Sequence, residues 1–330
     1  MKPFQYLRPK TIREAISMAA EDPDARYIAG GTNLIDLMKR GIVSPSKLID
    51  INHLPLKKIE HKGDRIHIGA LALNSEVAQN KLVTVRQPLL VKALLAGASG
   101  QLRNMATVGG NLLQRTRCSY FYDTALPCNK REPGSGCSAK EGINRTHAIF
   151  FYGNETPSCI AVHPSDMCVA LAALDTAVVV TGPNGERRLM MKDLHRLSTA
   201  QPELDTYLAP GELITSIEVL DNVFDKHNHY LKVRDRASYA FALVSVAAAL
   251  RMEEGKIWDA RVALGGVAHK PWRYWAIELM LKGKEPSEAL FREVADHELK
   301  SATASGQNAF KIKMTSNAIV AALKTAAGIS

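Results

Sequence analysis

The sequence predicts an α+β fold of roughly two or three domains. A chain of 330 residues, 46% of them hydrophobic, can bury a large core and exceeds the usual size of one domain. Helical and strand-like apolar spacings both occur along it, but they do not alternate in the strict β–α–β order of a parallel sheet. No internal repeat is visible, so we expect a mixed, non-repetitive fold.

The N-terminal segment predicts two helices and several short strands. Thr11 and Glu14 have the spacing of a capping box, and apolar residues follow at helical intervals, so a helix should run from Thr11 to about Ala20. The other expected elements are an extended segment at 26–29, a helix over 34–40, and strands at 47–51 and 65–70.

The remaining chain predicts more helices, two hairpins and one long loop. The loop covers 115–147, which has no clean periodicity and contains several prolines and glycines; loops of that length are usually functional or disordered. The expected regular elements are helices over 89–98, 164–174, 274–281, 286–299 and 309–326, a hairpin of 176–181 and 187–191 turned at 183–185, and strands at 230–233, 242–252 and 258–268.

The cysteines are gathered in one part of the chain. Cys118, Cys128, Cys137, Cys159 and Cys168 are the only five, and an odd number cannot form a fully paired disulfide framework. Their clustering favours shared metal ligands. The spacing C-x9-C-x8-C-x21-C of the first four differs from compact ferredoxin patterns and is nonspecific by itself.

Two Gly-Gly turns each lie between apolar residues and a segment of helical character. They are A-G-G-T-N-L at 29–34 and A-T-V-G-G-N-L at 106–112. Glycines allow close backbone approach and expose consecutive N–H groups, which suits a pyrophosphate. Either turn alone is equally compatible with a plain tight turn, and neither has the G-x-G-x-x-G pattern of a Rossmann fold.

In this order and spacing, the turns resemble those of the flavoprotein subunits of molybdenum hydroxylases, which include the FAD domain of xanthine dehydrogenases and the medium subunit of carbon monoxide dehydrogenases. The resemblance covers nearly the whole chain. It extends to H-P-S-D at 163–166, P-G-E-L-I at 210–214 and R-V-A-L-G-G-V-A at 261–268. Within the family, segments 100–104, 111–118, 120–123, 127–131, 133–137 and 232–241 most resemble the FAD subunit of periplasmic aldehyde oxidoreductases.

The resemblance implies a specific fold. We expect a PCMH/VAO-type FAD-binding domain over 1–222, made of subdomains 1–60 and 61–222 with a cysteine loop at 115–160. A C-terminal α+β domain of the carbon monoxide dehydrogenase flavoprotein type should follow over 223–330.

The resemblance also implies which residues bind FAD. Asp166 would bind ribose or ribityl hydroxyls with Glu212 in support, and Lys232 would lie near the isoalloxazine, where a cation stabilises negative charge on the reduced flavin. From the residues alone, Asp166 is also compatible with a carboxylate that satisfies helix N-terminal amides. The full implied set is Arg26, Tyr27, Ile28, Ala29, Gly30, Gly31, Thr32, Asn33, Leu34, Thr107, Gly110, Asn111, Asp166, Glu212 and Lys232.

For the cysteines, the resemblance implies a [4Fe–4S] cluster held by Cys118, Cys128, Cys137 and Cys159. Cys168 matches no ligand and should be a buried small residue of a helix. Tetrahedral zinc and independent buried thiols are the alternatives, although zinc ligands usually come in closely spaced pairs that this chain lacks.

Other polar residues carry weaker signals. Three histidines, His147, His163 and His269, have no sequence-local partner that would poise them for catalysis, so we expect structural roles. Near the cysteines, a cluster's potential could be tuned, or a partner docked, by the basic group of Arg115, Arg117, Lys130 and Arg131. A solvated loop face explains the same group equally well.

The implied activity is electron transfer, with no catalytic residue on this chain. A large partner subunit with a molybdenum cofactor would oxidise an aldehyde, and electrons would pass through [2Fe–2S] centres on a small partner to FAD here and then to an external acceptor. The implied assembly is a heterotrimer. Alternatives are a xanthine or carbon monoxide dehydrogenase-type subunit with another substrate, a self-sufficient flavin oxidase or dehydrogenase, and a non-redox assembly protein with structural zinc.

Charge and hydropathy exclude some partners. The net charge of +9 is spread along the chain without basic runs, which argues against nucleic acid binding. No apolar run approaches the roughly 20 residues of a membrane span, and the N-terminus lacks the pattern of a signal peptide. By resemblance we expect a periplasmic location through co-export on a partner's twin-arginine signal, with the cytoplasm as the alternative.

Overall fold

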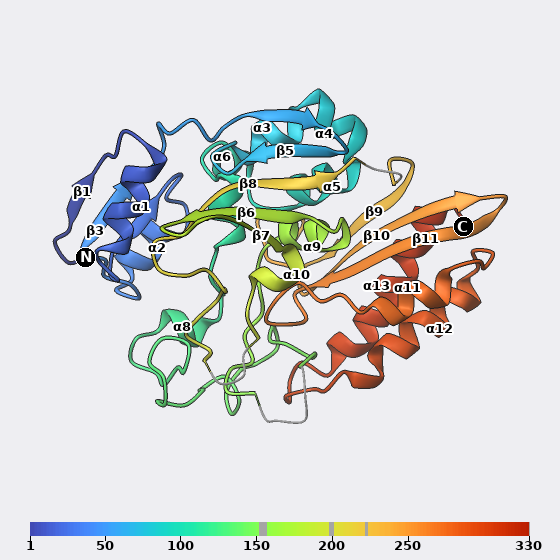
Figure 1. Cartoon of the computed structure of the whole chain (residues 1–330). Coiled ribbons are helices and arrows are strands. Elements are labelled where there is room, and N and C mark those ends of the chain that lie inside the picture. Colours follow the sequence, from blue (N-terminus) through green and yellow to red (C-terminus); the bar gives the residue numbers. More distant parts are fainter. Residues whose placement is uncertain (152–156, 198–200, 222–223, 330) are drawn as a thin grey trace.

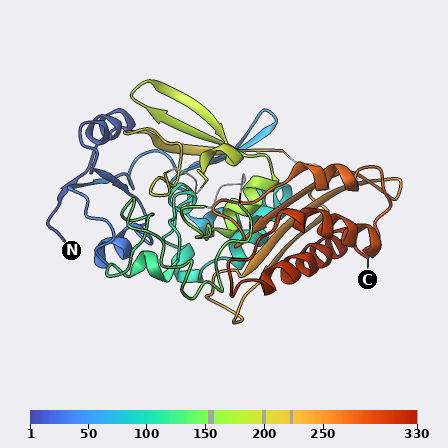
Figure 2. The same ribbon diagram turned by 90° about the horizontal axis from the view of Figure 1, so that it is seen from below.

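The computed structural model describes residues 1–151, 157–197, 201–221 and 224–329. Three units follow one another, each with its own sheet (Figure 1). The N-terminal and C-terminal units lie at opposite ends of the molecule with a five-stranded sheet between them, and the view from below keeps this order (Figure 2). The predicted α+β class is confirmed.

The N-terminal unit is a small parallel sheet with two helices. Its strands are in the order β1-β3-β2, and α1 buries Ala15, Ile16 and Ala19 against the sheet. The Thr11 Oγ1 accepts the Glu14 N–H at 3.1 Å, whereas the Glu14 carboxylate accepts from Lys10 rather than Thr11, so the capping is a variant of the predicted box. The elements are β1 (Gln5–Leu7), α1 (Ile12–Ala20), β2 (Arg26–Ile28), α2 (Leu34–Lys39) and β3 (Lys47–Asp50).

The middle unit is an antiparallel sheet covered by short helices. Its strand order is β4-β5-β8-β6-β7, which places the late strand β8 between two earlier ones. Helices α5 and α9 pack against each other over the main core. The elements are β4 (Ile59–Lys62), β5 (Arg65–Gly69), β6 (Ala177–Gly182), β7 (Gly185–Met190), β8 (Leu213–Leu220), α3 (Asn74–Gln79), α4 (Lys81–Arg86), α5 (Pro88–Ala96), α6 (Gly100–Arg103), α7 (Val108–Leu112), α9 (Asp166–Ala173) and α10 (Met191–Leu194).

The predicted long loop leaves this unit after α7. Its described part contains one short helix, α8 (Ser119–Tyr122), and packs on the N-terminal unit through a small cluster in which Phe121 and Cys128 meet Leu37 of α2. Figure 1 shows the loop as the green segment around α8, below the sheet. The loop therefore follows the second Gly-Gly turn in sequence and packs on the helix that follows the first one.

The C-terminal unit is a three-stranded antiparallel sheet with its own helices on one face and α5 and α9 of the middle unit on the other. Along β10, Ala247 and Ala249 join the core of the middle unit, while Val246 and Ala248 join the C-terminal core, because successive side chains alternate between faces. This sheet therefore couples the two units. The elements are β9 (His227–Val233), β10 (Val244–Glu253), β11 (Lys256–Gly265), α11 (Trp275–Leu281), α12 (Glu288–Glu298), the 3-10 turn η1 (Leu299–Ser301) and α13 (Phe310–Ala327). Within the described residues, no helix is long and apolar enough to cross a membrane.

Candidate functional site

The two Gly-Gly turns lie against each other. The first turn follows β2, and a Cβ on Gly30 would lie 1.8 Å from the carbonyl oxygen of Met105, immediately before the second turn. Only glycine permits that approach. Gly31 has φ +69°, a left-handed conformation that also favours glycine. Gly30 and Met105, 75 positions apart in the sequence, are thus in close backbone contact.

The second turn is held in place by hydrogen bonds and by close packing on its neighbours. Thr107 caps α7, its Oγ1 accepting the Gly110 N–H at 3.2 Å, and Gly109 packs closely on Ala70. The Asn111 Oδ1 accepts a hydrogen bond from the Ser165 hydroxyl at 2.7 Å. Since Ser165 caps α9, the turn is tied to the helix that carries Asp166.

Asp166 and Lys232 form a buried ion pair. The Lys232 Nζ lies 2.8 Å from Asp166 Oδ2, with side-chain exposures of only 5% and 8%. The Tyr230 hydroxyl donates to Asp166 Oδ1 at 2.8 Å, and Lys232 also donates to the Ala96 carbonyl. Burial, followed by the Asp166 charge, raises the pKa of Tyr230 well above its ordinary value. The predicted FAD contacts Asp166 and Lys232 are therefore brought together.

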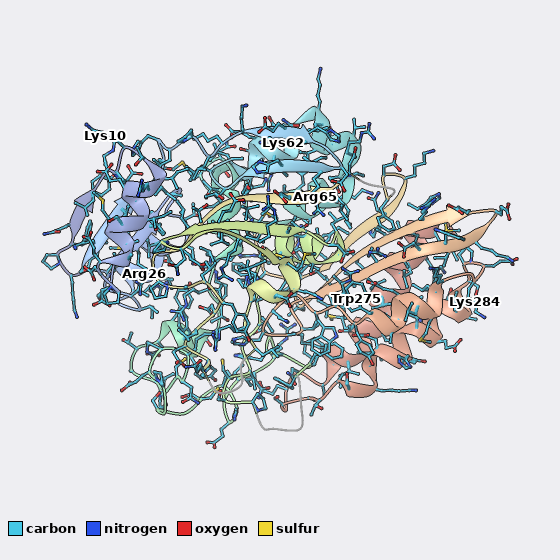
Figure 3. All side chains as sticks on the ribbon, in the orientation of Figure 1. Lys10, Arg26, Lys62, Arg65, Trp275 and Lys284 are labelled. Atoms are coloured by element: carbon cyan, nitrogen blue, oxygen red, sulfur yellow. The ribbon has the colours of Figure 1, made fainter. Side chains whose placement is uncertain are left out.

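Three other residues of the implied FAD-binding set make hydrogen bonds or ion pairs with other groups of the protein. The Arg26 guanidinium donates to the carbonyls of Pro23 and Ala25, on the N-terminal unit where Figure 3 labels Arg26. The Tyr27 hydroxyl donates to the Gly211 carbonyl at 2.8 Å. Glu212 binds Arg187 through both oxygens at 2.6 and 2.7 Å, which joins it to β7 rather than to Asp166.

Two features of the turns bear on what they could bind. A Cβ on Gly30 would collide with the Met105 backbone, and the Asn33 side chain offers a buried Nδ2 group without a partner. An unpaired buried donor costs about 1–3 kcal/mol, so a ligand acceptor there would be favourable. The Asn33 Oδ1 accepts the Arg115 N–H at 2.9 Å, and this hydrogen bond orients the amide. Ile28, Ala29, Thr32 and Leu34 belong to the same turn and its flanks.

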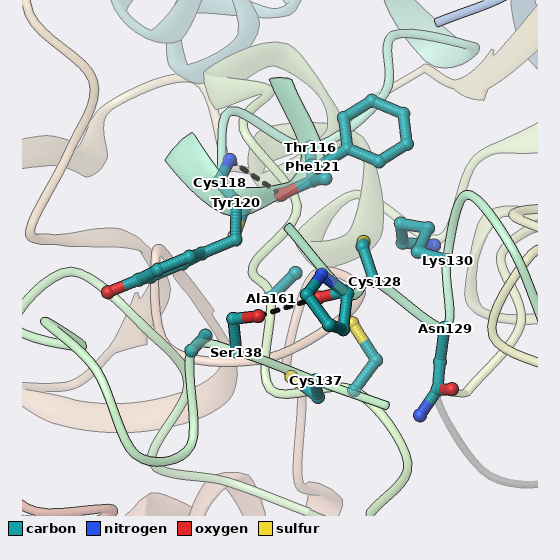
Figure 4. A pocket seen from close by; sticks show the side chains of 13 residues that line it. Thr116, Cys118, Tyr120, Phe121, Cys128, Asn129, Lys130, Cys137, Ser138 and Ala161 are labelled. Atoms are coloured by element: carbon teal, nitrogen blue, oxygen red, sulfur yellow. Dashed lines mark hydrogen bonds between the residues drawn. The ribbon is translucent and has the colours of Figure 1, made fainter. Parts of the chain in front are cut away.

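The four predicted cluster cysteines line a single pocket. Cys118, Cys128 and Cys137 are labelled around it in Figure 4, and Cys159 completes the lining. Cys128 and Cys137 face each other through an isolated antiparallel bridge. All five cysteines are free thiols. Burial raises the pKa of Cys118 to about 11 and that of Cys159 to about 12, so in the absence of a metal these are neutral thiols.

The spacing of these sulfurs bears on which metal group fits. A tetrahedral zinc with Zn–S bonds near 2.3 Å holds its sulfurs roughly 3.8 Å apart. In the described part of the chain, one group of three or more His, Cys, Asp or Glu ligand atoms lies mutually within 4.8 Å, and it contains none of these four cysteines. No three of the four pocket cysteines therefore have sulfurs mutually within 4.8 Å.

The basic residues of the loop are internal braces, which corrects the alternative of a solvated face. Lys130, with 1% side-chain exposure, and Arg115 both bind Asp205 at 2.5 Å. The two cations outweigh the effect of burial and hold the pKa of Asp205 well below its ordinary value. Arg131 donates to the carbonyls of Tyr120 and Phe121. Arg117 donates to the Tyr122 hydroxyl at 2.8 Å and lies over the Phe241 ring.

A histidine and a lysine connect this pocket to the C-terminal unit. The Nε2 of His147 lies 3.1 Å from Cys118 Sγ, and burial lowers the pKa of His147 to about 4. Lys311 of α13, fully buried, donates to the carbonyls of Thr146, His147 and Gly266. The sequence reasoning missed both Lys311 and Asp205. Lys311 lies four residues before Thr315 on the buried side of α13, a signal that could have been noticed, whereas Asp205 has no local pattern.

Comparison with protein families divides the chain in two. Residues 2–219 match the family described as the FAD binding domain in molybdopterin dehydrogenase, and residues 229–326 match the carbon monoxide dehydrogenase flavoprotein C-terminal domain. The first match covers the Gly-Gly turns, Asp166 and the cysteine pocket. The second covers Lys232 and Lys311.

Individual relatives extend the same likeness over the full chain. The aldehyde oxidoreductase FAD-binding subunit PaoB of Escherichia coli is 47% identical over 328 residues, covering 99% of each chain. The glyceraldehyde dehydrogenase medium chain of Sulfolobus acidocaldarius is 27% identical over 88% of this chain and 85% of its own. The solved carbon monoxide dehydrogenase of Oligotropha carboxidovorans shares the fold, with a TM-score of 0.79 at 22% identity over 100% and 99% of the two chains. The chain is therefore an FAD-binding oxidoreductase subunit of the molybdenum hydroxylase family.

Proposed function

We propose that this chain is the FAD- and [4Fe–4S]-containing electron-transfer subunit of a molybdenum-dependent aldehyde oxidoreductase. The observation that carries the cluster is the convergence of Cys118, Cys128, Cys137 and Cys159 on one pocket, although they are spread over 42 positions of sequence. The aldehyde class is supported by the relative named an aldehyde oxidoreductase subunit. Other relatives are named for glyceraldehyde and carbon monoxide, and the proposal assigns substrate selection to the large partner subunit.

The residues of this chain bind and orient the cofactors. FAD, when bound, supplies the chemistry of accepting and passing on electrons. The turns at 29–34 and 106–112 would hold its pyrophosphate and ribityl chain. The buried Asp166–Lys232 pair would present a hydroxyl-binding carboxylate beside a cation that favours a reduced, negatively charged ring.

The proposal includes two partners, a large molybdenum-cofactor subunit and a small [2Fe–2S] subunit, in a heterotrimer that passes electrons to an external acceptor. The naming of relatives as medium chains or FAD-binding subunits supports such an assembly. We also propose a periplasmic location through co-export on a partner's signal. Cell fractionation with and without that signal tests it: the chain should move to the cytoplasm when the signal is removed, and a chain that stays periplasmic would contradict it.

The cluster is tested by Cys118→Ser in the purified complex, with Ser119→Ala as the neighbouring control. The parent should contain about four irons in this chain, as four-thiolate clusters of this type do, and show flavin bands with a broad shoulder near roughly 400 nm. Cys118→Ser should lose this iron and retain FAD, whereas Ser119→Ala should keep both. Full iron in Cys118→Ser would contradict the ligand assignment.

Aldehyde turnover of the same variant tests the electron-transfer role. If the cluster carries electrons, dye-linked oxidation should fall with the iron content. Unchanged turnover in an iron-free, FAD-loaded Cys118→Ser complex would show that the cluster only braces the loop.

A further inference from the structure

A second group of metal-type ligands lies between the FAD turns and the cysteine pocket. It contains His163, His195 and Cys168, whose ligand atoms all lie within 4.8 Å of one another. The His163 and His195 rings are 4.3 Å apart between centroids. His195 was not singled out by the sequence, because its contacts come from segments distant in the chain.

Each histidine in this region has one ring nitrogen paired and one left over. The Nε2 of His195 lies 2.8 Å from the Leu112 carbonyl, and the Nδ1 of His269 lies 3.2 Å from the Ala161 carbonyl. The remaining nitrogens, Nδ1 of His195 and Nε2 of both His163 and His269, are buried without a partner. Buried polar atoms are almost always satisfied, so the three unpaired nitrogens in this region are expected to bind an ion or buried water.

The paired nitrogens establish which tautomers are present. A carbonyl oxygen can only accept, so His195 carries its proton on Nε2 and His269 on Nδ1, and their buried nitrogens present lone pairs. Metal-bound histidines typically donate their other N–H to a backbone carbonyl in this way. The Ser165 N–H donates to His163 Nδ1 at 3.3 Å, so in this geometry the neutral ring carries its proton on Nε2. Metal binding through Nε2 would move that proton to Nδ1 and break this long contact.

Cys168 supplies a sulfur donor to the same place. It is fully buried at the start of α9, and its Sγ makes one distant contact, 4.0 Å from the Asn111 carbonyl. Three imidazoles and one thiolate suit tetrahedral zinc, which takes nitrogen and sulfur ligands in closed four-coordinate structural sites. Compact spacing distinguishes this group from the wider four-cysteine pocket.

We propose that His163, Cys168 and His195 bind a structural Zn²⁺ ion, and that His269, whose ligand atom lies outside their 4.8 Å group, moves towards the ion as the fourth ligand. The ion would tie together α7, through the Leu112 carbonyl, the N-terminus of α9, and the Ala161 segment that follows Cys159. It would thereby hold the second FAD turn and the cysteine pocket in one rigid block. This inference stands whether or not the four-cysteine pocket holds iron.

The test is elemental analysis of the purified complex, expressed with zinc and dialysed against a mild chelator. Wild type should retain about one zinc in this chain, as a closed four-ligand site does, and His195→Gln and Cys168→Ala should each lose it. The crossed control is Cys118→Ser, which should lose iron but keep zinc. Zinc K-edge X-ray absorption should report three nitrogen ligands and one sulfur in wild type, and no sulfur in any zinc left in Cys168→Ala.

Two outcomes would overturn the proposal. One is wild-type protein without stoichiometric zinc, which would mean that buried water satisfies the histidines. The other is zinc that is lost in Cys118→Ser and retained in His195→Gln, which would place it in the four-cysteine pocket. The iron and FAD contents of the same samples test the electron-transfer proposal separately, and an unchanged circular dichroism spectrum shows that each variant has folded.

Discussion

Glu298 is a buried carboxyl group at the end of α12. The indole N–H of Trp272 donates to its Oε1, while Oε2 is buried without a partner. Burial, with a further contribution from the charge of Glu278, raises the pKa of Glu298 to about 7. The unfolded value is near 4.5, so the folded state binds the proton more tightly. The resulting stability is fully present below pH 4.5 and is lost as the pH rises through about 7.

We therefore expect Glu298→Gln to flatten the pH dependence of stability. Relative to wild type, the variant should gain up to about 3 kcal/mol between pH 5 and pH 8, because its neutral amide never pays for a buried charge. Denaturant unfolding at both pH values measures this. Glu293→Gln, at an exposed site on the same helix, is the control and should leave the profile unchanged. A Glu298→Gln profile parallel to that of wild type would contradict the shift.

At the level of elements, the contact between the two turns should control FAD binding. In Gly30→Ala the new methyl group would collide with the Met105 carbonyl, so the turns must separate. We expect FAD affinity to fall roughly tenfold or more, which corresponds to about 1.4 kcal/mol of lost binding energy. Fluorescence titration of the flavin-depleted protein measures it.

Gly100→Ala is the matched control for that change. A Cβ at Gly100 has nothing within 4 Å, and the residue begins the short helix α6 just before the second turn. This variant should bind FAD like wild type. Equal affinities of the two alanine variants would mean that the contact between the turns is unimportant for the flavin.

The elements that sequence predicted best are those with a complete local pattern. The helix that begins after Thr11 appears where its cap and apolar spacing place it, and β10 and β11 form the expected hairpin. Strand β8 was noticed only as a P-G-E-L-I motif, although it is central in the five-stranded sheet. Its partners, β5 and β6, are distant in sequence, and strand order depends on long-range packing that a local pattern does not contain.

The residues of the candidate site also differ in how far the sequence alone could predict them. The glycines of both turns are visible in sequence because their backbone requirement is local. The ion pair between Asp166 and Lys232 spans 66 positions, and the anchoring of Lys130 by Asp205 spans 75, so neither could be derived without the fold. The FAD-contact roles and the domain boundaries stay predictions.

For the whole molecule, Asp175 connects the middle unit to the C-terminal unit. It follows α9 with φ 49°, and its carboxylate accepts from Arg261 at 2.9 Å and from Arg273 at 2.6 Å. Asp175→Asn retains a residue that tolerates this backbone conformation but removes the charge. We expect a loss of about 1.5–3 kcal/mol, the usual contribution of a hydrogen bond to a charged group.

Guanidinium denaturation measures this coupling. Asp259→Asn is the control, since Asp259 also pairs with Arg261 but lies on the same strand and joins no second unit. Its effect should be under about 1 kcal/mol, as for other solvent-exposed pairs. If the two variants lose equal stability, the ion pairs of Asp175 do not couple the units.

The backbone contact at Gly30 has a thermodynamic consequence for flavin loading. Its two sides belong to the N-terminal and middle units, so a flavin seated across both would bind the closed arrangement and not the separated one. By mass action, free FAD at 100 times its dissociation constant would then add about 2.7 kcal/mol to the stability of that arrangement. Proteolytic nicking of the connection between β3 and β4 should accordingly slow as FAD is titrated in, so that digestion rate becomes a reporter of cofactor supply.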